Sequence, residues 1–252
     1  MSNLLSSSST RIKTGLVLLL GILVIGYIDS YSVMWVLFGT LLAIALYEAQ
    51  KLFSFENKYI YVVSAILWIM AYFHPTPEDL VFVVALIYAS ILAYTKELNK
   101  KFFVILLYPT APFLFLFSLY TEFGIQIMLW LLVVVAGTDV GAYFVGKSVG
   151  KTKFCETSPN KTIEGVIGGV AAASLLGCFF SFGEMSIWTS LLISFLVAIA
   201  SVFGDLFESY LKREANVKDS GNLLPGHGGI LDRTDGYLFA GIIMLILLRA
   251  FS

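Results

Sequence analysis

Residues 125–146 read IQIMLWLLVVVAGTDVGAYFVG, and this stretch decides the fold. A helix needs about 20 predominantly apolar residues to cross the hydrocarbon core of a bilayer, and this stretch is long enough. Its single charged residue, Asp139, lies toward the carboxyl end. An ionisable side chain at membrane depth indicates function by default, although an interfacial carboxylate or a helix cap would also fit. The stretch therefore predicts a membrane-spanning helix that ends in a polar site.

The rest of the chain has the same apolar character. Of its 252 residues, 58% are hydrophobic and 13% are charged, and its mean hydropathy is +0.88, whereas soluble domains are about half apolar and about a quarter charged. The apolar runs should be helices, because backbone groups in lipid must bond within their own segment and the alternating strands of a barrel are missing. We expect an all-α integral membrane protein with about nine transmembrane helices. The expected helices cover residues 14–28, 32–47, 59–73, 79–95, 102–120, 125–146, 163–182, 186–207 and 236–251.

The amino-terminal apolar run requires a separate test, because it resembles a secretory signal. Arg11 and Lys13 precede the apolar residues 15–28, as the basic start of a signal precedes its apolar core. No small-x-small cleavage site follows, and Asp29 leads directly into the next apolar run. We therefore expect residues 15–28 to be retained as the first span.

The distribution of basic residues predicts the orientation in the membrane. Lys and Arg gather in the cytoplasmic loops of membrane proteins. With a cytoplasmic N-terminus, every Lys and Arg except Arg249 falls in an inner segment. These inner segments are residues 1–13, 48–58, 96–101, 147–162 and 208–235. We expect a multi-pass protein of the cell (inner) membrane whose N-terminus faces the cytoplasm.

The chain changes character along its length, which predicts two domains. Residues 1–130 read as N-terminal transmembrane helices with short connections, whereas residues 131–252 add the polar loops 147–162 and 208–235. Both loops fall on the predicted cytoplasmic side, so we expect a catalytic C-terminal domain with its active site facing the cytoplasm. The net charge of -1 gives no electrostatic reason to expect a nucleic-acid partner.

The segment from Gly204 to Gly236 carries more charge than a simple connection between helices needs. Asp232 and Asp235 lie three residues apart, so their carboxylates share a face if the last helix begins near Leu231. Carboxylate oxygens suit Mg²⁺, which takes a few protein ligands and leaves room for phosphate oxygens and water. A charged juxtamembrane loop with helix caps is the plainer alternative.

Basic residues and glycines surround these two carboxylates. The basic side chains that could neutralise phosphate oxygens are Lys212, Arg213, Lys218 and Arg233. Gly226, Gly228 and Gly229 let backbone N–H groups approach an anion closely. His227, beside them, could contact a phosphate, carry a proton or stabilise the turn. The combination is typical of phosphoryl or nucleotidyl transfer.

A second polar cluster lies in residues 137–165. Within it, residues 141–148 match the phosphate-loop pattern G-x-x-x-x-G-K-S. That motif works between a strand and a helix of a parallel sheet, and no such context exists here. We therefore interpret the match as a coincidence that does not indicate the P-loop NTPase fold, although Lys147 could still meet a phosphate.

Two pairs of glycines in this region have four-residue spacing, namely Gly137 with Gly141 and Gly165 with Gly169. Small residues at this spacing are typical of helices that pack closely in lipid. We expect a close helix contact at these positions.

Three longer patterns in the polar segments are more specific. The cytoplasmic segment holds the run Ser209-x2-Lys212-Arg213-x4-Lys218-Asp219-x-Gly221-x2-Leu224-Pro225-x-His227-Gly228-Gly229-Ile230-x-Asp232-Arg233-Thr234-Asp235. Earlier in the chain are the elements Asp139-x2-Ala142-Tyr143-Phe144-x-Gly146-x3-Gly150-Lys151 and Ser158-Pro159-x-Lys161-Thr162-x-Glu164-Gly165. Over residues 136–250 these patterns resemble the phosphatidate cytidylyltransferases, a family also called CDP-diacylglycerol synthases.

That resemblance implies an enzyme, a nucleotidyltransferase of phospholipid biosynthesis. It implies that CTP and phosphatidate react to give CDP-diacylglycerol and pyrophosphate, with Mg²⁺ required and a second cation left open. It further implies a site at the cytoplasmic face of the lipid bilayer and a tendency to form homodimers.

The resemblance and the local chemistry together give the expected site. The expected catalytic residues are Asp232, Asp235, Lys212, Arg213, His227 and Arg233. The residues expected to bind the phosphorylated reactants are Lys161, Ser158, Lys151, Lys218, Gly228 and Gly229. The expected metal ligands are Asp232, Asp235, Asp205 and Asp219.

Two other functions stay open at this point. A related CTP-dependent membrane enzyme could act on another lipid, because the polar residues report on the phosphates more than on the lipid tails. An ion-coupled transporter would use Asp139 and Asp205 as intramembrane carboxylates. Against the transporter, the polar residues gather at one face, whereas carriers bind near the bilayer midplane.

Overall fold

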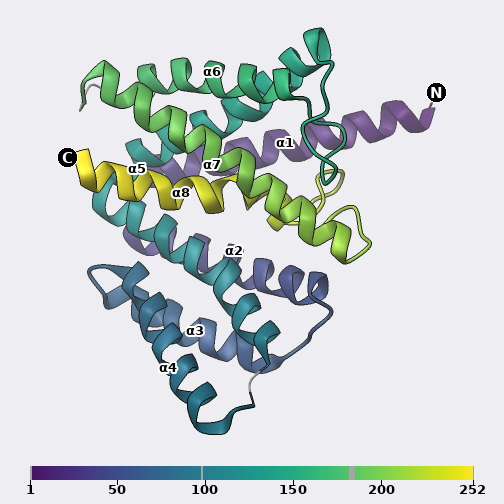
Figure 1. The fold of residues 1–252 in the computed structure, drawn as a ribbon. Coiled ribbons are helices and arrows are strands. Elements are labelled where there is room, and N and C mark those ends of the chain that lie inside the picture. Colours follow the sequence, from purple (N-terminus) through teal and green to yellow (C-terminus); the bar gives the residue numbers. More distant parts are fainter. Residues whose placement is uncertain (1, 98, 182–184, 252) are drawn as a thin grey trace. The chain divides into compact units, whose positions relative to one another are not determined.

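The computed structural model describes residues 2–97, 99–181 and 185–251, with the side chains of residues 2–12 and 19 excepted. Within those ranges the eight α-helices are α1 (Ser2–Ile28), α2 (Tyr31–Leu52), α3 (Lys58–Phe73), α4 (Leu80–Thr95), α5 (Lys100–Val149), α6 (Ile163–Phe180), α7 (Ile187–Glu214) and α8 (Leu231–Phe251) (Figure 1). A 3-10 turn, η1 (Pro77–Asp79), precedes α4. In the same residues, pairing between extended segments is confined to two isolated bridges. The predicted all-α class is confirmed.

Helix α5 contains a break at Gly124, whose φ of 77° and ψ of −175° are not helical. Glycine adopts a positive φ readily because it has no Cβ. Helix α5 therefore comprises two helical segments, and these correspond to the separate helices predicted at 102–120 and 125–146.

Six helical segments in the described part of the chain are long and apolar enough to cross a membrane, namely α2, η1 with α4, α5, α6, α7 and α8. The apolar part of α1, Lys13–Ile28, and helix α3 are shorter. These lengths and compositions agree with a multi-pass membrane protein. The count of about nine spans and the cytoplasmic N-terminus stay predictions.

The chain divides into two compact units. The first unit comprises the residues up to Ser118 together with Glu214–Arg233. The second unit comprises Leu119–Arg213 together with the residues from Thr234 onward. The loop that precedes α8 thus belongs with the amino-terminal helices, although α6 and α7 separate them in sequence.

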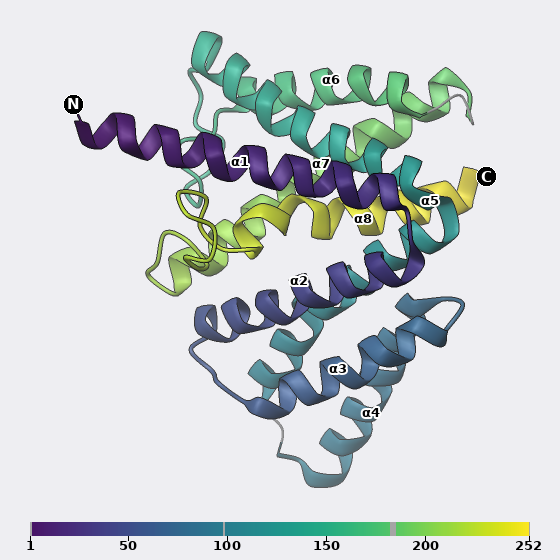
Figure 2. The same ribbon diagram turned by 180° about the vertical axis from the view of Figure 1, so that it is seen from behind.

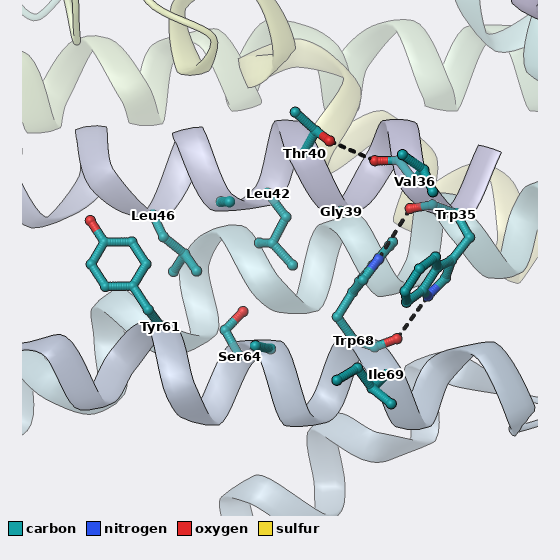
Figure 3. A pocket seen from close by; sticks show the side chains of 12 residues that line it. Trp35, Val36, Gly39, Thr40, Leu42, Leu46, Tyr61, Ser64, Trp68 and Ile69 are labelled. Atoms are coloured by element: carbon teal, nitrogen blue, oxygen red, sulfur yellow. Dashed lines mark hydrogen bonds between the residues drawn. The ribbon is translucent and has the colours of Figure 1, made fainter. Parts of the chain in front are cut away.

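In the first unit, helices α2 and α3 pack through two tryptophans. Nε1 of Trp35 donates to the backbone oxygen of Trp68 at 2.8 Å, and Nε1 of Trp68 donates to the backbone oxygen of Trp35 at 3.1 Å (Figure 3). Beside them, between the same helices, lies a pocket of about 520 Å³. Its lining includes Leu46, Tyr61 and Ser64 and carries no charged side chain (Figure 3). This pocket therefore holds none of the residues predicted to form the site.

In the second unit, the predicted glycine contact between helices is confirmed. A Cβ on Gly141 would lie 3.0 Å from the Cα of Gly169, and a Cβ on Gly169 would lie 2.5 Å from the backbone oxygen of Thr138. Helix α6 accordingly runs beside the second segment of α5 (Figures 1 and 2). Because no side chain separates the two backbones, the end of α5 and the start of α6 are held close together.

Helices α7 and α8 of the second unit also touch through a glycine. A Cβ on Gly204 would overlap the backbone oxygen of Asp235. The rings of Phe207 and Phe239 pack with their centroids 5.6 Å apart. This contact places Asp205, the neighbour of Gly204, beside Asp235 and Gly236 of α8.

Candidate active site

A charged pocket of about 450 Å³ lies in the second unit, where α5 ends and α6 begins. This charged pocket is lined by Asp139, Tyr143, Lys147, Ser158, Asn160 and Lys161, with backbone at two glycines. Its volume is typical of sites for small molecules, which occupy about 300–1,000 Å³. Two lysines with hydroxyl and amide groups suit a phosphorylated ligand.

The loop between α5 and α6 is fixed by one carboxylate. Oε2 of Glu164 accepts from the backbone N–H of Lys151 at 3.1 Å, and Oε1 accepts from the hydroxyl of Thr152 at 2.8 Å. Oγ1 of Thr162 caps α6 by accepting from the N–H of Gly165 at 3.1 Å. An acidic residue and a threonine cap are both favourable in the first turn of a helix. These contacts hold the loop against the start of α6. Ser158, Asn160 and Lys161 of the loop line the charged pocket there.

Lys161 connects this loop to helix α7. Its ammonium group lies 2.5 Å from Oδ2 of Asp205, and both side chains are partly exposed. Oγ of Ser209 also donates to Oδ1 of Asp205, at 3.3 Å. A predicted metal ligand therefore pairs with a predicted phosphate-binding lysine that lines the charged pocket.

Asp235 completes this group of charges. The charges of Asp205, Asp139 and Lys212 all act on its carboxylate, and its Oδ1 accepts from the N–H of Gly236 at 2.7 Å. Lys212 in turn forms an ion pair with Glu208, which is fully buried one turn earlier on α7. Three carboxylates and two lysines from three helices and a loop thus act on one another within the second unit.

The donor chemistry of this group fits Mg²⁺, because Asp139, Asp205 and Asp235 offer hard oxygen ligands. In the described residues, however, no three side chains of Asp, Glu, His or Cys are already gathered as a metal-binding group. Mg²⁺ is usually held by only one or two carboxylates, with substrate phosphates and water completing its shell. The residues present are compatible with an ion that arrives with a phosphorylated substrate.

Asp232 lies in a different setting, which belongs to the first unit. Its Oδ2 accepts from the N–H of Ser220 at 2.8 Å, from the hydroxyl of Ser220 at 2.9 Å and from the N–H of Gly229 at 2.8 Å. Ser220 and Gly229 are both buried. One oxygen of the predicted metal ligand Asp232 therefore organises the loop before α8.

A tight turn follows in the same loop. The N–H of Leu224 donates to the backbone oxygen of Gly228 at 2.9 Å, and the N–H of His227 donates to the backbone oxygen of Leu224 at 2.8 Å. The φ values of Gly226 and Gly228 are 77° and 83°, which glycine adopts without strain. Nε of Arg233 donates to the backbone oxygen of His227 at 2.8 Å. His227 and Arg233 thus shape this turn, while their direct role toward a substrate stays a prediction.

Most of the predicted site residues fall into two groups, one in each unit, and four lie outside both. In the second unit, Ser158 and Lys161 line the charged pocket and Asp205 pairs with Lys161. The charges of Asp205 and Lys212 act in turn on Asp235. The first unit brings together His227, Gly228, Gly229, Asp232 and Arg233 in the loop before α8. The remaining predicted residues, Lys151, Arg213, Lys218 and Asp219, are exposed at helix ends and in loops.

Glu48 is a residue that the sequence patterns missed. It was expected in the inner loop 48–58, but α2 continues to Leu52 and only 2% of Glu48 is exposed. Its carboxylate accepts from the backbone N–H groups of Ile230 and Leu231, at 3.0 and 2.8 Å. The signal that could have identified it is an acidic residue at the end of an apolar run, which is costly there unless it is paired.

The fold and the site define an integral membrane protein of several helices, with polar groups for a phosphorylated ligand gathered at helix ends. The chain belongs to the cytidylyltransferase family, whose model matches residues 9–251. A phosphatidate cytidylyltransferase of Helicobacter pylori strain J99 is 43% identical over 251 residues, which cover 98% of this chain and 94% of that relative. One from Bacillus subtilis strain 168 is 47% identical over 135 residues, which cover 52% of this chain and 50% of that relative.

Proposed function

We propose that this chain is a nucleotidyltransferase that converts CTP and phosphatidate into CDP-diacylglycerol and pyrophosphate, a step of phospholipid biosynthesis. The similarity to relatives of that name extends over nearly the whole length of both chains. The observation that carries the proposal is the charged pocket, where Lys161 meets Asp205 in a chain whose helices can span a membrane. A lipid substrate with a charged head group requires both features.

In the proposed reaction, a phosphate oxygen of phosphatidate attacks the α-phosphorus of CTP. A new bond forms between that oxygen and the α-phosphorus, and the bond from the α-phosphorus to the bridging oxygen of the β-phosphate breaks. Pyrophosphate leaves with the bonding electrons. The attacking oxygen is already ionised near neutral pH, so no strong general base is needed. The main barriers are the repulsion between two anions and the charge that develops on the leaving group.

The side chains of the charged pocket address these two barriers. Lys161 and Lys147 neutralise phosphate oxygens, and Ser158 donates a hydrogen bond to them. Glu208 holds the ammonium group of Lys212 near Asp235, where it balances part of the negative charge. Such groups are effective because they are oriented before the reaction begins.

Within the second unit, Mg²⁺ would be held by Asp235 and Asp205. Asp232 and Asp219, which the sequence also predicts as metal ligands, belong to the first unit. When bound, the ion supplies Lewis-acid stabilisation of phosphoryl oxygens. The partial exposure of Asp205 supports this assignment, because an ion that keeps its water and phosphate ligands needs an open side.

The orientation and assembly are also part of the proposal. The excess of Lys and Arg in one set of loops supports a site on the cytoplasmic face of the inner membrane. The acyl chains of phosphatidate then stay in the bilayer while its head group enters the charged pocket. A homodimer is proposed from the family resemblance alone.

The test is product formation by purified full-length protein in detergent micelles. CTP is supplied with phosphatidate, with an isoprenoid alcohol or with an archaeal ether-lipid phosphate, each with Mg²⁺ or with a chelator. We expect CDP-lipid from phosphatidate, much less CDP-lipid from the ether-lipid phosphate, little phosphorylated product from the isoprenoid alcohol, and no product with the chelator. Product from another lipid but not from phosphatidate would assign the chain to a related CTP-dependent enzyme. No CDP-lipid from any acceptor would remove the proposed function.

A further inference from the structure

Glu48 on α2 lies against the start of α8 within the first unit. Its Oε1 accepts from the N–H of Ile230 at 3.0 Å, and its Oε2 accepts from the N–H of Leu231 at 2.8 Å. The second of these contacts joins residues that are 183 positions apart in the sequence. Oε2 also accepts from the hydroxyl of Ser220 at 3.0 Å. One carboxylate from an amino-terminal helix therefore holds both ends of the segment 220–231.

A buried carboxylate is costly unless hydrogen-bond donors compensate it. Glu48 shares the one hydroxyl hydrogen of Ser220 with Asp232, and two N–H groups at the amino end of α8 donate to Glu48. Those groups have no partner inside their own helix, and the helix dipole favours a negative charge at that end. Glu48 thus caps α8 from a distant helix, and the start of α8 is fixed relative to α2.

The packing around Glu48 leaves no room for adjustment. A Cβ on Gly221 would lie 2.5 Å from Oε1 of Glu48, and a Cβ on Gly229 would overlap the same oxygen and the hydroxyl of Ser220. Both positions are glycine, so the loop backbone can approach the carboxylate directly. The contact is therefore built into the loop sequence as well as into α2.

Ser220 links Glu48 to Asp232. Its hydroxyl lies 3.0 Å from Oε2 of Glu48 and 2.9 Å from Oδ2 of Asp232, and its N–H donates to the same Oδ2. Gly229, which touches Glu48, also donates its N–H to Oδ2 of Asp232. Ser220 and Gly229, which donate to Oδ2 of Asp232, are therefore both residues that Glu48 contacts. If Glu48 moves, the orientation of Asp232 changes with it.

We propose that Glu48 is a positioning residue for the nucleotidyl transfer, acting through Ser220 and Gly229 to set the orientation of Asp232. The inference rests on the proposed function, because Asp232 is one of the residues assigned to that reaction. It gives the amino-terminal helices a part in catalysis beyond anchoring in the membrane.

The test compares two isosteric changes of buried carboxylates in the first unit, Glu48→Gln and Glu78→Gln. Glu78 is also buried and accepts from the hydroxyl of Ser118, away from the loop before α8. In Glu48→Gln, one carboxylate oxygen becomes an NH₂ group. This NH₂ group is a donor and faces a donor of the loop, so the hydrogen bond between them is lost. In Glu78→Gln the loop contacts are untouched.

Two quantities are measured on full-length protein in detergent, the amide hydrogen exchange of Ile230 and Leu231 and the kcat for CDP-lipid formation per folded molecule. For Glu48→Gln we expect faster exchange at both amides and a kcat lower by about 10–100-fold, the range for partners that orient a ligand residue. For Glu78→Gln we expect unchanged exchange at these amides and an unchanged kcat, even if less protein folds.

Ser220→Ala provides the second variant, which keeps Glu48 and removes the link to Asp232. We expect its kcat to fall as well, and the double variant with Glu48→Gln to lose less than the product of the two single losses. Normal kcat in both single variants, or unchanged exchange in Glu48→Gln, would overturn the proposal. If the unaltered protein makes no CDP-lipid, the proposed function fails by itself, and faster exchange in Glu48→Gln still establishes that Glu48 holds the loop.

Discussion

The ammonium group of Lys161 lies 2.5 Å from Oδ2 of Asp205, and this ion pair joins the loop after α5 to helix α7. The exposed fractions of the two side chains are 22% and 28%, so solvent weakens their attraction and the pair contributes modestly to stability. Its importance lies in joining Lys161, which lines the charged pocket and is proposed to bind phosphate, to Asp205, which is proposed to bind the metal.

Replacing Lys161 by alanine should impair the use of CTP more than it impairs folding. We expect kcat/KM for CTP to fall by about 100–1,000-fold, as for the loss of one preorganised electrostatic donor. The measurement is initial-rate kinetics of CDP-lipid formation. Lys153→Ala is the matched control, because Lys153 is an exposed lysine of the same loop outside the pocket lining. Equal rates for the two variants would argue against a phosphate role for Lys161.

Asp205→Asn and Asp235→Asn should each reduce turnover by about 100-fold or more, because each removes a charge from the group that is proposed to hold Mg²⁺. The Mg²⁺ concentration for half-maximal rate should also rise in whichever variant keeps measurable activity. Both quantities come from rates at a series of Mg²⁺ concentrations. The exposed Glu156→Gln serves as the control of the same charge change. Near-normal turnover in both aspartate variants would make this site assignment wrong.

Gly229→Ala should lower stability, because the new Cβ would overlap Glu48 and Ser220 in a buried place. Overpacking of this kind costs about 1–3 kcal/mol of unfolding free energy. Thermal unfolding of the purified protein measures the effect. Gly21→Ala in α1 is the control, since no atom lies within 4 Å of its added Cβ. If Gly229→Ala unfolds at the same temperature as Gly21→Ala, the close packing at Gly229 would be contradicted.

Glu164→Gln should loosen the loop that lines the charged pocket. Its carboxylate accepts from Lys151 N–H and from both the N–H and the hydroxyl of Thr152. Losing hydrogen bonds to a charged group should raise KM for CTP by about tenfold, equivalent to about 1.4 kcal/mol. A double-mutant cycle with Thr152→Val measures the coupling directly. Additive effects of the two changes would show that this contact does not hold the loop.

The helices could be predicted from the sequence because hydropathy is a local property. The runs at 102–120 and 125–146 were separated correctly, and the break between them is the positive φ of Gly124. The last helix was harder to delimit. It begins at Leu231, five residues before the predicted range of 236–251, because Asp232 and the residues around it continue the helix into the polar segment.

The site was only partly accessible to sequence patterns. Spacing placed Asp232 and Asp235 together as a metal pair, but it could not show that one oxygen of Asp232 is engaged by Ser220 and Gly229. The contact of Glu48 with Leu231 spans 183 positions, and no local pattern reports such a pairing. Side-chain partners depend on the packing of distant helices, which hydropathy does not encode.

The central claim, transfer of the cytidylyl group to phosphatidate, is tested most directly by the position of a label in CTP. Purified protein is supplied with phosphatidate and with CTP labelled at either the α-phosphate or the γ-phosphate, and the lipid is then extracted. We expect that label from the α-phosphate enters the lipid and that label from the γ-phosphate is released as pyrophosphate. Label from the γ-phosphate in the lipid, or no labelled lipid from either CTP, would contradict the claim.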